Sequence, residues 1–391
     1  MNPLARSILM VLVVLACLPP VVTSWQEKGK TGQRVFVIPS PAGEAETAPD
    51  FKAELITPGP VAPSVHVASV CEGPDGRLNA AWYGGSREGA ADVDIFWSQR
   101  EPGADKPWSK PRALVSRDSA MRELRRPIKK VGNAVLFANG AGQLRLIYVT
   151  VSLGGWSTSS LNVKTSRDAG QTWGNSQRLT LSPFFNFSEL VKNNPAGLSD
   201  GGWAVPIYHE FLAKFPEILW MKETAGGEIS WSKTRIFGGR SALQPALVPQ
   251  DQRAAIVLCR DSSAMRRIQV SRSTDLGMNW SPPQSLTLPN CDSGLDALRL
   301  FDGRMLLAFN DSPTGRDNLS LALSDDGGLN WSRRAILESE PGAEFSYPYL
   351  IQARDGRVHL VYTWKRKAIK YAAFNLEWLD TQAKSGPGGA K

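Results

Sequence analysis

Apolar and polar residues alternate in short runs along most of the chain, and turn-forming residues separate these runs. Two examples are Arg304–Phe309 (RMLLAF) and Arg357–Tyr362 (RVHLVY), each of which follows an Asp-Gly pair. Alternation with a period of two predicts strands with one buried face, and Asp-Gly is typical of tight hairpin turns. Long stretches with the helical period are absent. The pattern therefore predicts a β protein built from antiparallel hairpins.

These turns recur, which indicates an internal repeat. Six polar or glycine turns between apolar runs lie roughly 50–65 residues apart, at Asp75-Gly76, Gly140–Gly142, Asp200-Gly201, Asp251-Gln252, Asp302-Gly303 and Asp355-Gly356. A second series interleaves with them and has the pattern Ser-x-Asp-x-Gly-x-x-Trp. Its full copies are Ser166–Trp173, Ser273–Trp280 and Ser324–Trp331, and degenerate copies end at Trp108 and Trp231.

Each repeat reads as strand, turn, strand, strand, Asp-containing turn and strand, which is one four-stranded antiparallel sheet. A single sheet of this kind cannot bury both faces, whereas a ring of sheets can. Six turns predict six blades, so the fold class is all-β, a six-bladed β-propeller. The sixth blade lacks the Asp-containing turn, and we expect a strand from residues 32–39 to close it. We expect the Asp-containing turns to be structural.

The chain termini carry expectations of their own. Arg6, an apolar run of 11 residues from Ile8 to Leu18, and Pro19-Pro20 predict a signal peptide over residues 1–24, cleaved before Trp25. An uncleaved membrane anchor and lipid attachment at Cys17 are the alternatives. We expect an exported protein, periplasmic or secreted, without stable membrane insertion once the signal is removed. The propeller should span residues 32–379, with a disordered tail over residues 380–391.

Composition and charge limit the classes of partner and cofactor that we expect. The 391 residues carry a net charge of +8, and the densest basic cluster is Arg122–Lys130 (RELRRPIKK). This cluster is either a solvated loop or an attraction for an anionic substrate, surface or polysaccharide. Nucleic acid is not expected, because no helix-turn-helix or RNP-like pattern accompanies the charge. Four Cys without CxxC spacing and three His predict no metal site, and no cofactor is implied.

The innermost strands of a propeller converge on its axis, so their first residues should line a shared pocket. Counting back from each hairpin turn identifies one polar position in every blade: His66, Asn133, Asn193 or Asn194, Gln244, Asp292 or Ser293, and Tyr347. A wet central channel that merely tolerates polar groups would give the same pattern. The density of polar groups favours a polar ligand such as a sugar.

Further charged residues follow or precede the strands near these positions. The loop 84–94 (GGSREGAADVD) carries Glu88 and Asp92, which belong either to a plain surface loop or to a carboxyl acid over the pocket. Arg260 ends one apolar strand and Arg316 precedes another. These arginines are either solvated or placed to bind a carboxylate bidentately from neighbouring blades.

From Val65 to Leu379 the chain resembles the sialidase (neuraminidase) superfamily, most closely its Asp-box (BNR) repeat group. The resemblance rests on the Asp boxes, on Tyr347 nine residues before Gly356, and on Arg260 and Arg316. It implies that Tyr347 is the nucleophile of a glycoside hydrolase. It also implies that Arg260 and Arg316 are the second and third members of an arginine triad that binds a substrate carboxylate. Glu88 or Asp92 would be the acid/base.

Two positions depart from the family pattern. His66 stands where the family has the first arginine, in an Arg-Ile-Pro motif, and Gln244 stands where it has the Glu that takes the proton of the tyrosine. A neutral amide cannot act as that base. A protonated His66 would restore part of the carboxylate binding, and a neutral His66 would serve as the base for Tyr347.

Three hypotheses follow, all with an acidic glycan or polysaccharide as partner. The first is an exported exo-glycoside hydrolase that removes a terminal acidic sugar, sialic acid or a related one. The second is a polysaccharide lyase in which His66 and Tyr347 act on a uronate. The third is a glycan-binding propeller without catalysis. The substrate-binding residues would be Arg260, Arg316, Gln244, Asn133, Asn194 and Asp292.

Overall fold

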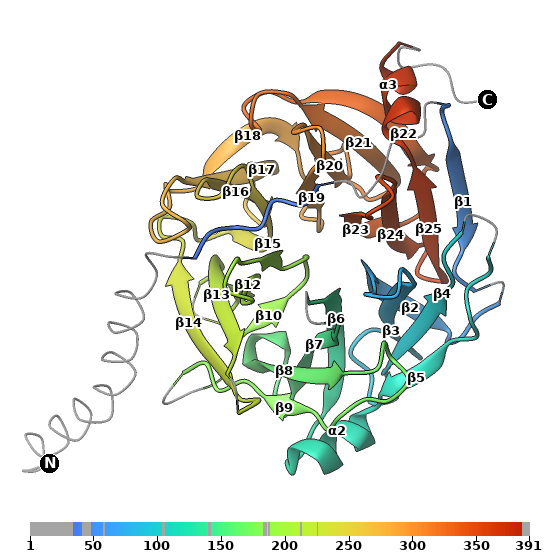
Figure 1. Cartoon of the computed structure of the whole chain (residues 1–391), viewed down its shortest axis with the longest axis vertical. Coiled ribbons are helices and arrows are strands. Elements are labelled where there is room, and N and C mark those ends of the chain that lie inside the picture. The colour runs from blue at the N-terminus through green and yellow to red at the C-terminus, as the bar shows by residue number, and fades with distance from the viewer. Residues whose placement is uncertain are drawn as a thin grey trace, which may run out of the picture.

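The computed structural model describes residues 34–40, 48–57, 59–103, 106–139, 142–182, 186, 188–211, 213–224 and 226–384. Within these ranges, six antiparallel sheets stand around a central axis like the blades of a propeller (Figure 1). The predicted fold class is confirmed. The predicted signal peptide, including Cys17, lies outside the described residues.

Five of the six blades use the strands in chain order, from the axis outwards. Blade 1 comprises β2 (Ser64–Glu72), β3 (Leu78–Gly85), β4 (Asp94–Arg100) and β5 (Arg112–Val115). Blade 2 comprises β6 (Lys130–Ala138), β7 (Leu144–Val151), β8 (Ser159–Ser166) and β9 (Gln177–Arg178). Blade 3 comprises β10 (Leu190–Val191), β12 (Trp203–His209), β13 (Phe215–Glu223) and β14 (Ile229–Arg235), with β11 (Ala196–Gly197) also on β12.

Blades 4 and 5 follow the same order, and blade 6 takes its outermost strand from the other end of the chain. Blade 4 comprises β15 (Ala242–Pro249), β16 (Ala255–Asp261), β17 (Arg267–Ser273) and β18 (Gln284–Pro289). Blade 5 comprises β19 (Asp296–Arg299), β20 (Met305–Phe309), β21 (Asn318–Ser324) and β22 (Ser332–Ser339). Blade 6 comprises β23 (Phe345–Gln352), β24 (Val358–Trp364), β25 (Ala368–Phe374) and β1 (Phe51–Leu55).

The ring is closed by a different strand from the one expected. β1 pairs with β25 in continuous register, from Phe51 opposite Phe374 to Leu55 opposite Lys370. The expectation that residues 32–39 close blade 6 is wrong. That segment forms only an isolated bridge, between Phe36 and Leu198, and the Phe36 side chain is buried beside Trp220 of blade 3. The buried Phe36 side chain therefore holds this segment across one end of the ring (Figure 1).

Because every innermost strand runs in the same direction along the axis, the loops divide between two ends. The end where the innermost strands begin is called the site end; the loops after the second strand of each blade lie there too. The Asp boxes join third and fourth strands and lie at the opposite end. Their aspartates accept hydrogen bonds from backbone amides four residues on, as in Asp168 with the amide of Thr172 at 2.9 Å. The hydroxyl of Thr172 donates to the same carboxylate, and this hydroxyl and the amide together hold the pKa of Asp168 at about 2. This is turn-forming chemistry, as expected.

Two helices connect or follow the blades. α2 (Arg117–Leu124) lies between blades 1 and 2 and begins with a capping box at Ser116. α3 (Leu376–Lys384) follows β25, and its Asp380 pairs with Arg304 at 2.5 Å. The predicted boundary at residue 379 falls inside this helix, and residues 385–391 of the predicted tail lie outside the described residues.

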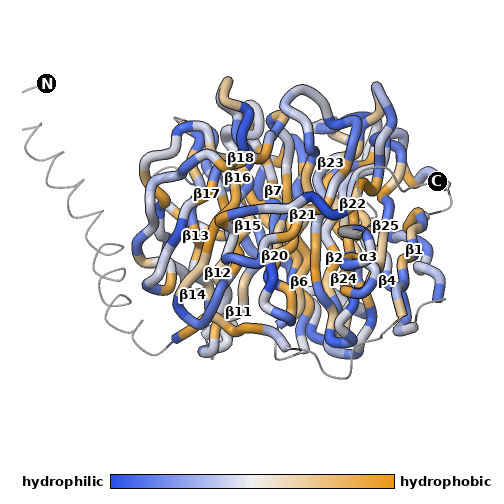
Figure 2. The backbone as a smooth tube through the Cα atoms, turned by 90° about the horizontal axis from the view of Figure 1, so that it is seen from above, coloured by the Kyte–Doolittle hydropathy of each residue, from blue (hydrophilic) through white to orange (hydrophobic). Residues whose placement is uncertain are grey.

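The core lies between adjacent blades, where apolar strands face one another, while polar loops cover both ends (Figure 2). Cys71 and Cys259 are buried in it as free thiols, and Cys291 is a partly exposed free thiol. None of the helices in the described ranges has the length and apolar character needed to cross a bilayer.

Candidate active site

The innermost strands are bent at the site end by residues in the left-handed conformation. Val67, Asn133, Gln244 and Tyr347 have φ of 50°, 33°, 50° and 55°, and the strand register shifts beside each of them. Asp292, just before β19, has φ of 58°. Non-glycine residues in this region cost on the order of 1–3 kcal/mol each and cluster at functional sites. Positions in five different blades thus carry the same strain around one axis.

Tyr347 lies at the centre of a hydrogen-bonded group. Arg260, at the end of β16, donates from Nη1 to the phenol oxygen of Tyr347 and to Oε1 of Gln244, both at 3.3 Å. The phenol is partly exposed, whereas Gln244 is buried. A guanidinium at this distance stabilises negative charge that develops on the phenol oxygen.

Asp292 orients both arginines of the predicted pair. Its carboxylate accepts from Nε of Arg260 at 2.6 Å, and its backbone carbonyl accepts from Nη2 of Arg316 at 2.9 Å. The Arg316 guanidinium carbon lies 5.5 Å from the centre of the Tyr347 ring. A Cβ atom at Gly294 would lie 2.9 Å from Oε1 of Gln244 and 3.1 Å from the Tyr347 ring, so a larger residue there would have to displace them. The structure therefore brings Arg260, Arg316 and Tyr347 together.

A third arginine joins this group, and the sequence reasoning missed it. Arg366 lies in the turn between β24 and β25 and pairs with Glu344 at 2.6 Å through Nε. Glu344 also reaches Nη1 of Arg316 at 3.4 Å. These contacts hold the pKa of Glu344 at about 2, with the guanidinium of Arg366 and the hydroxyl of Ser346 outweighing the effect of burial. The cation-rich turn Trp364–Lys367 (WKRK), at the site end, was the available signal.

His66 is buried against Tyr347, with the two ring centres 4.5 Å apart and nearly perpendicular. Its Nδ1 lies 3.0 Å from Thr363 Oγ1, and Nε2 has no hydrogen-bond partner among the described residues. Burial, reinforced by the nearby charge of Arg366, lowers the pKa of His66 to about 3. His66 is therefore neutral near neutral pH and does not replace an arginine as a cation.

This burial predicts an acid-labile contribution to stability. In the unfolded chain His66 titrates near 6.5, so protons favour the unfolded state as the pH falls from about 6.5 towards 3. At about pH 5 the expected loss is about 2 kcal/mol. Urea unfolding at neutral and acidic pH should show a pH dependence that is smaller by this amount in His66→Gln. An equal dependence in both proteins would contradict a buried neutral His66.

The two candidate acids on the loop 84–94 have different surroundings. Asp92 is exposed, and its carboxylate accepts from the backbone N and the Oγ of Ser86 at 3.0 and 2.9 Å, which lowers its pKa. Glu88 pairs with Nη1 of Arg366 at 3.0 Å. Through Arg366 and Glu344, Glu88 is linked to the group around Tyr347, whereas Asp92 stabilises its own loop.

Of the predicted asparagines, Asn133 and Asn193 belong to the group around Tyr347, whereas Asn194 does not. Asn133 donates to Oη of Tyr208 at 3.3 Å, and Tyr208 also receives a hydrogen bond from Gln244 at 3.4 Å. Asn193 is buried and donates to the backbone carbonyl of Gln244. Asn194 instead accepts a hydrogen bond from the phenol of Tyr349, two residues beyond Tyr347, so it is not part of the group.

A buried lysine, Lys192, stabilises the bend of the innermost strand at Tyr347. Lys192 crosses the axis and donates from Nζ to the backbone carbonyls of Leu295 in blade 5 and Pro348 in blade 6. Burial lowers its pKa to about 8. Because Pro348 follows Tyr347 directly, Lys192 fixes the backbone on which the phenol stands.

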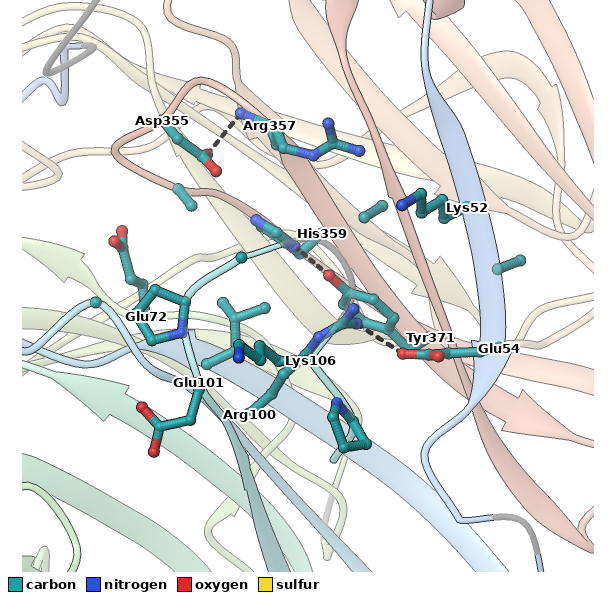
Figure 3. Close-up of a pocket in the computed structure, with 18 residues that line it drawn as sticks. Lys52, Glu54, Glu72, Arg100, Glu101, Lys106, Asp355, Arg357, His359 and Tyr371 are labelled. Carbon is teal, nitrogen blue, oxygen red and sulfur yellow. Dashed lines mark hydrogen bonds and ion pairs between the residues drawn. The ribbon is translucent and has the colours of Figure 1, made fainter. Parts of the chain in front are cut away.

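A separate cavity of about 780 Å³ lies at the opposite end, between blades 1 and 6 (Figure 3). Several of its polar groups pair with one another: His359 contacts the Tyr371 phenol at 2.7 Å, and Arg100 pairs with Glu54 at 2.6 Å. The cavity does not include any residue of the group around Tyr347. In the described part of the chain, no cluster of His, Cys, Asp or Glu has the makings of a metal site.

Comparison with known proteins agrees with this architecture. The model of a family described as BNR repeat-like domain matches residues 76–360. The chain therefore belongs to the sialidase-like BNR-repeat superfamily. A sialidase from Bacteroides fragilis (strain YCH46) is 24% identical over 232 residues, which are 56% of this chain and 42% of the relative. The chain thus spans about two fifths of the length of that curated relative.

Solved structures share the fold at low identity. Hadza microbial sialidase Hz136 has a TM-score of 0.66 and 18% identity over 80% of this chain and 66% of its own. A leech intramolecular trans-sialidase has a TM-score of 0.62 and 14% identity over 82% and 69%. A protein of unknown function from Dyadobacter fermentans has a TM-score of 0.64 and 13% identity over 80% and 94%. At these identities the likeness shows the propeller fold alone.

Proposed function

We propose that the protein is an exo-glycoside hydrolase that removes a terminal acidic sugar, sialic acid or a related one, from a glycan. The observation that carries the proposal is Tyr347 on the propeller axis, in contact with Arg260 and next to Arg316. A phenol is a suitable nucleophile for a substrate with its own carboxylate, because a carboxylate nucleophile would be repelled. The two arginines supply charged hydrogen bonds to that carboxylate.

The reaction would proceed in two displacements. Tyr347 Oη forms a bond to the anomeric carbon and would give its proton to Nε2 of the neutral His66 beside it. The bond from that carbon to the leaving oxygen breaks at the same time, and Glu88 donates a proton to the leaving oxygen. A water then attacks the anomeric carbon and Glu88 takes its proton, while Tyr347 leaves with its electron pair and would take its proton back from His66. Two displacements at one carbon return the original anomeric configuration. Asp92 is not assigned this role because Ser86 already engages its carboxylate.

Arg366 would supply the third cation that binds the substrate carboxylate, a role that the neutral His66 does not fill. It stands beside Arg316 through their shared partner Glu344, and its charge is the largest charge effect on buried His66. When a substrate carboxylate engages Arg366, Glu88 loses this partner. The Glu88 carboxyl group would then be free to turn to the leaving oxygen.

The side chains around the Tyr347 phenol also suit a second candidate function, a polysaccharide lyase. Arg260 donates a hydrogen bond to the Tyr347 phenol, and the adjacent side chain at the family's base position is the neutral Gln244. Neutral His66 lies against the phenol, and its Nε2 is unpartnered among the described residues. A histidine and a tyrosine beside arginines also suit a lyase that abstracts the C5 proton of a uronate and eliminates the leaving group.

Gln244→Glu separates these two functions. It installs a carboxylate 3.3 Å from Arg260 and beside Tyr347, at the place where a hydrolase would use a base. If Tyr347 is a nucleophile, hydrolysis should rise roughly tenfold, since a positioned base contributes about 10²–10⁴-fold and this one shares Arg260. The measurement is kcat on a sialoside. A rise in elimination products without a rise in hydrolysis would favour the lyase.

The proposal itself is tested by a screen of acidic glycans with product analysis by mass. A hydrolase adds one water to each bond that it cleaves and releases the free acidic sugar. A lyase produces an unsaturated uronate without adding water. Folded protein that binds a glycan and yields neither product would contradict both and leave the binding propeller.

A further inference from the structure

The loops of blades 2, 3 and 4 at the site end expose large apolar side chains. Leu153 between β7 and β8 is 80% exposed, Phe237 between β14 and β15 is 68%, and Met265 between β16 and β17 is 67%. Phe211 between β12 and β13 is also exposed. The described site-end loops of blades 1, 5 and 6 carry no exposed large apolar residue. These four side chains therefore form a one-sided apolar rim, here called the rim, beside the group around Tyr347.

Basic side chains accompany the rim. Lys129 donates from Nζ to the backbone carbonyl of Gly154, next to Leu153, and the Nζ of Lys130 lies 3.8 Å from the centre of the Trp156 ring in the same loop. The Arg235 guanidinium lies 5.3 Å from the ring of Phe237. The basic cluster noted in the sequence, Arg122–Lys130, thus reaches this side of the site end.

The acidic side chains of these segments offer little opposing charge. Asp118 pairs with Arg117 at 3.0 Å, and Glu123 pairs with Lys164 at 2.7 Å. Glu210 is half-buried, and burial raises its pKa. In contrast Arg125, Lys129, Arg235 and Arg240 are exposed. The rim therefore combines exposed apolar tips with an excess of exposed positive charge.

We propose that the rim binds the surface of an anionic lipid bilayer, with the site end of the propeller facing the membrane. Exposed apolar side chains are stabilised when they enter the boundary between headgroups and acyl chains, and basic residues beside them are attracted to anionic lipids. A soluble polyanion would use the charges but would leave the apolar tips in water. The glycans that reach the site would then be those borne on membrane lipids or membrane proteins. This inference does not depend on the chemistry proposed for Tyr347.

Co-sedimentation with vesicles of phosphatidylcholine, with and without phosphatidylserine, tests the rim. The triple variant Leu153→Ser, Phe237→Ser and Met265→Ser should bind the anionic vesicles about tenfold more weakly than the unchanged protein. The matched control is Leu329→Ser with Ile336→Ser, because these residues are 64% and 60% exposed but lie away from the site-end loops. The control should bind like the unchanged protein.

Charge is tested in the same way. Lys129→Glu with Arg240→Glu should also weaken binding about tenfold, whereas Lys106→Glu with Lys110→Glu, exposed at the opposite end, should not. Equal binding by rim and control variants would overturn the proposal. The proposal would also be overturned if the serine variant lost binding to soluble dextran sulfate as much as binding to vesicles. A serine variant whose only change is reduced self-association in sedimentation velocity would overturn it as well. Circular dichroism confirms that each variant is folded.

Discussion

Tyr347→Phe is expected to reduce turnover of an acidic glycoside at least about 10³-fold, because removal of a covalent nucleophile typically has an effect of this size or larger. The change deletes one oxygen and leaves the ring in contact with His66 and Arg316. Substrate binding should change little, since the arginines that we propose to bind the carboxylate remain. The measurements are kcat on a chromogenic sialoside and the dissociation constant of the released sugar.

The matched control is Tyr371→Phe, which removes a phenol oxygen from the cavity at the opposite end, where it contacts His359 at 2.7 Å. Activity of this variant should stay within about twofold, because remote surface or cavity changes act on stability and not on the reacting atoms. Comparable losses in the two variants would show that the phenols act through the fold. Unchanged turnover in Tyr347→Phe would exclude this tyrosine as the nucleophile.

Arg260→Lys is expected to lower kcat/KM about 10²-fold, because a charged hydrogen bond contributes about 1.5–3 kcal/mol and lysine cannot reproduce the fork of a guanidinium. Arg260 contacts Asp292 through Nε, and Gln244 and Tyr347 through Nη1. A lysine keeps the charge and loses these simultaneous contacts. The loss should fall on kcat as well as KM, since the same guanidinium reaches the phenol oxygen and would bind the substrate carboxylate.

The control for this change is Arg145→Lys. Arg145 is buried, pairs with Glu223 and lies over Trp203, but it belongs to the second strand of blade 2, close to its start at the opposite end. This variant should lose stability without a selective loss of kcat/KM. If Arg260→Lys retained full activity on acidic substrates, the assignment of Arg260 to the carboxylate would be contradicted.

Much of the fold was predictable because its signals are local. The Asp-Gly turns and Asp boxes specify hairpins from a few adjacent residues, and their repetition specifies the blade number. The spacing from Tyr347 to Gly356, and the positions of Arg260 and Arg316 beside apolar strands, likewise follow from strand length. These residues were therefore brought to one end of the ring by rules that operate within single blades.

The rest depends on contacts between segments that are distant in the chain. Pairing of Phe51–Leu55 with β25 is decided by which segment reaches the open edge, and residues 34–39 are diverted by the burial of Phe36. Arg366 gains its place only through Glu344 and Glu88, which come from other turns. The protonation state of His66 follows from burial that no local pattern reveals.

The most direct test of the proposed hydrolysis follows the first product of a sialoside digest by proton NMR, before the free sugar equilibrates between its anomers. Two displacements through Tyr347 predict a saturated acidic sugar that initially has the anomeric configuration of the substrate. The same spectrum should show no product with Tyr347→Phe. An inverted sugar, an unsaturated uronate, or release by Tyr347→Phe at the unchanged rate would contradict the account.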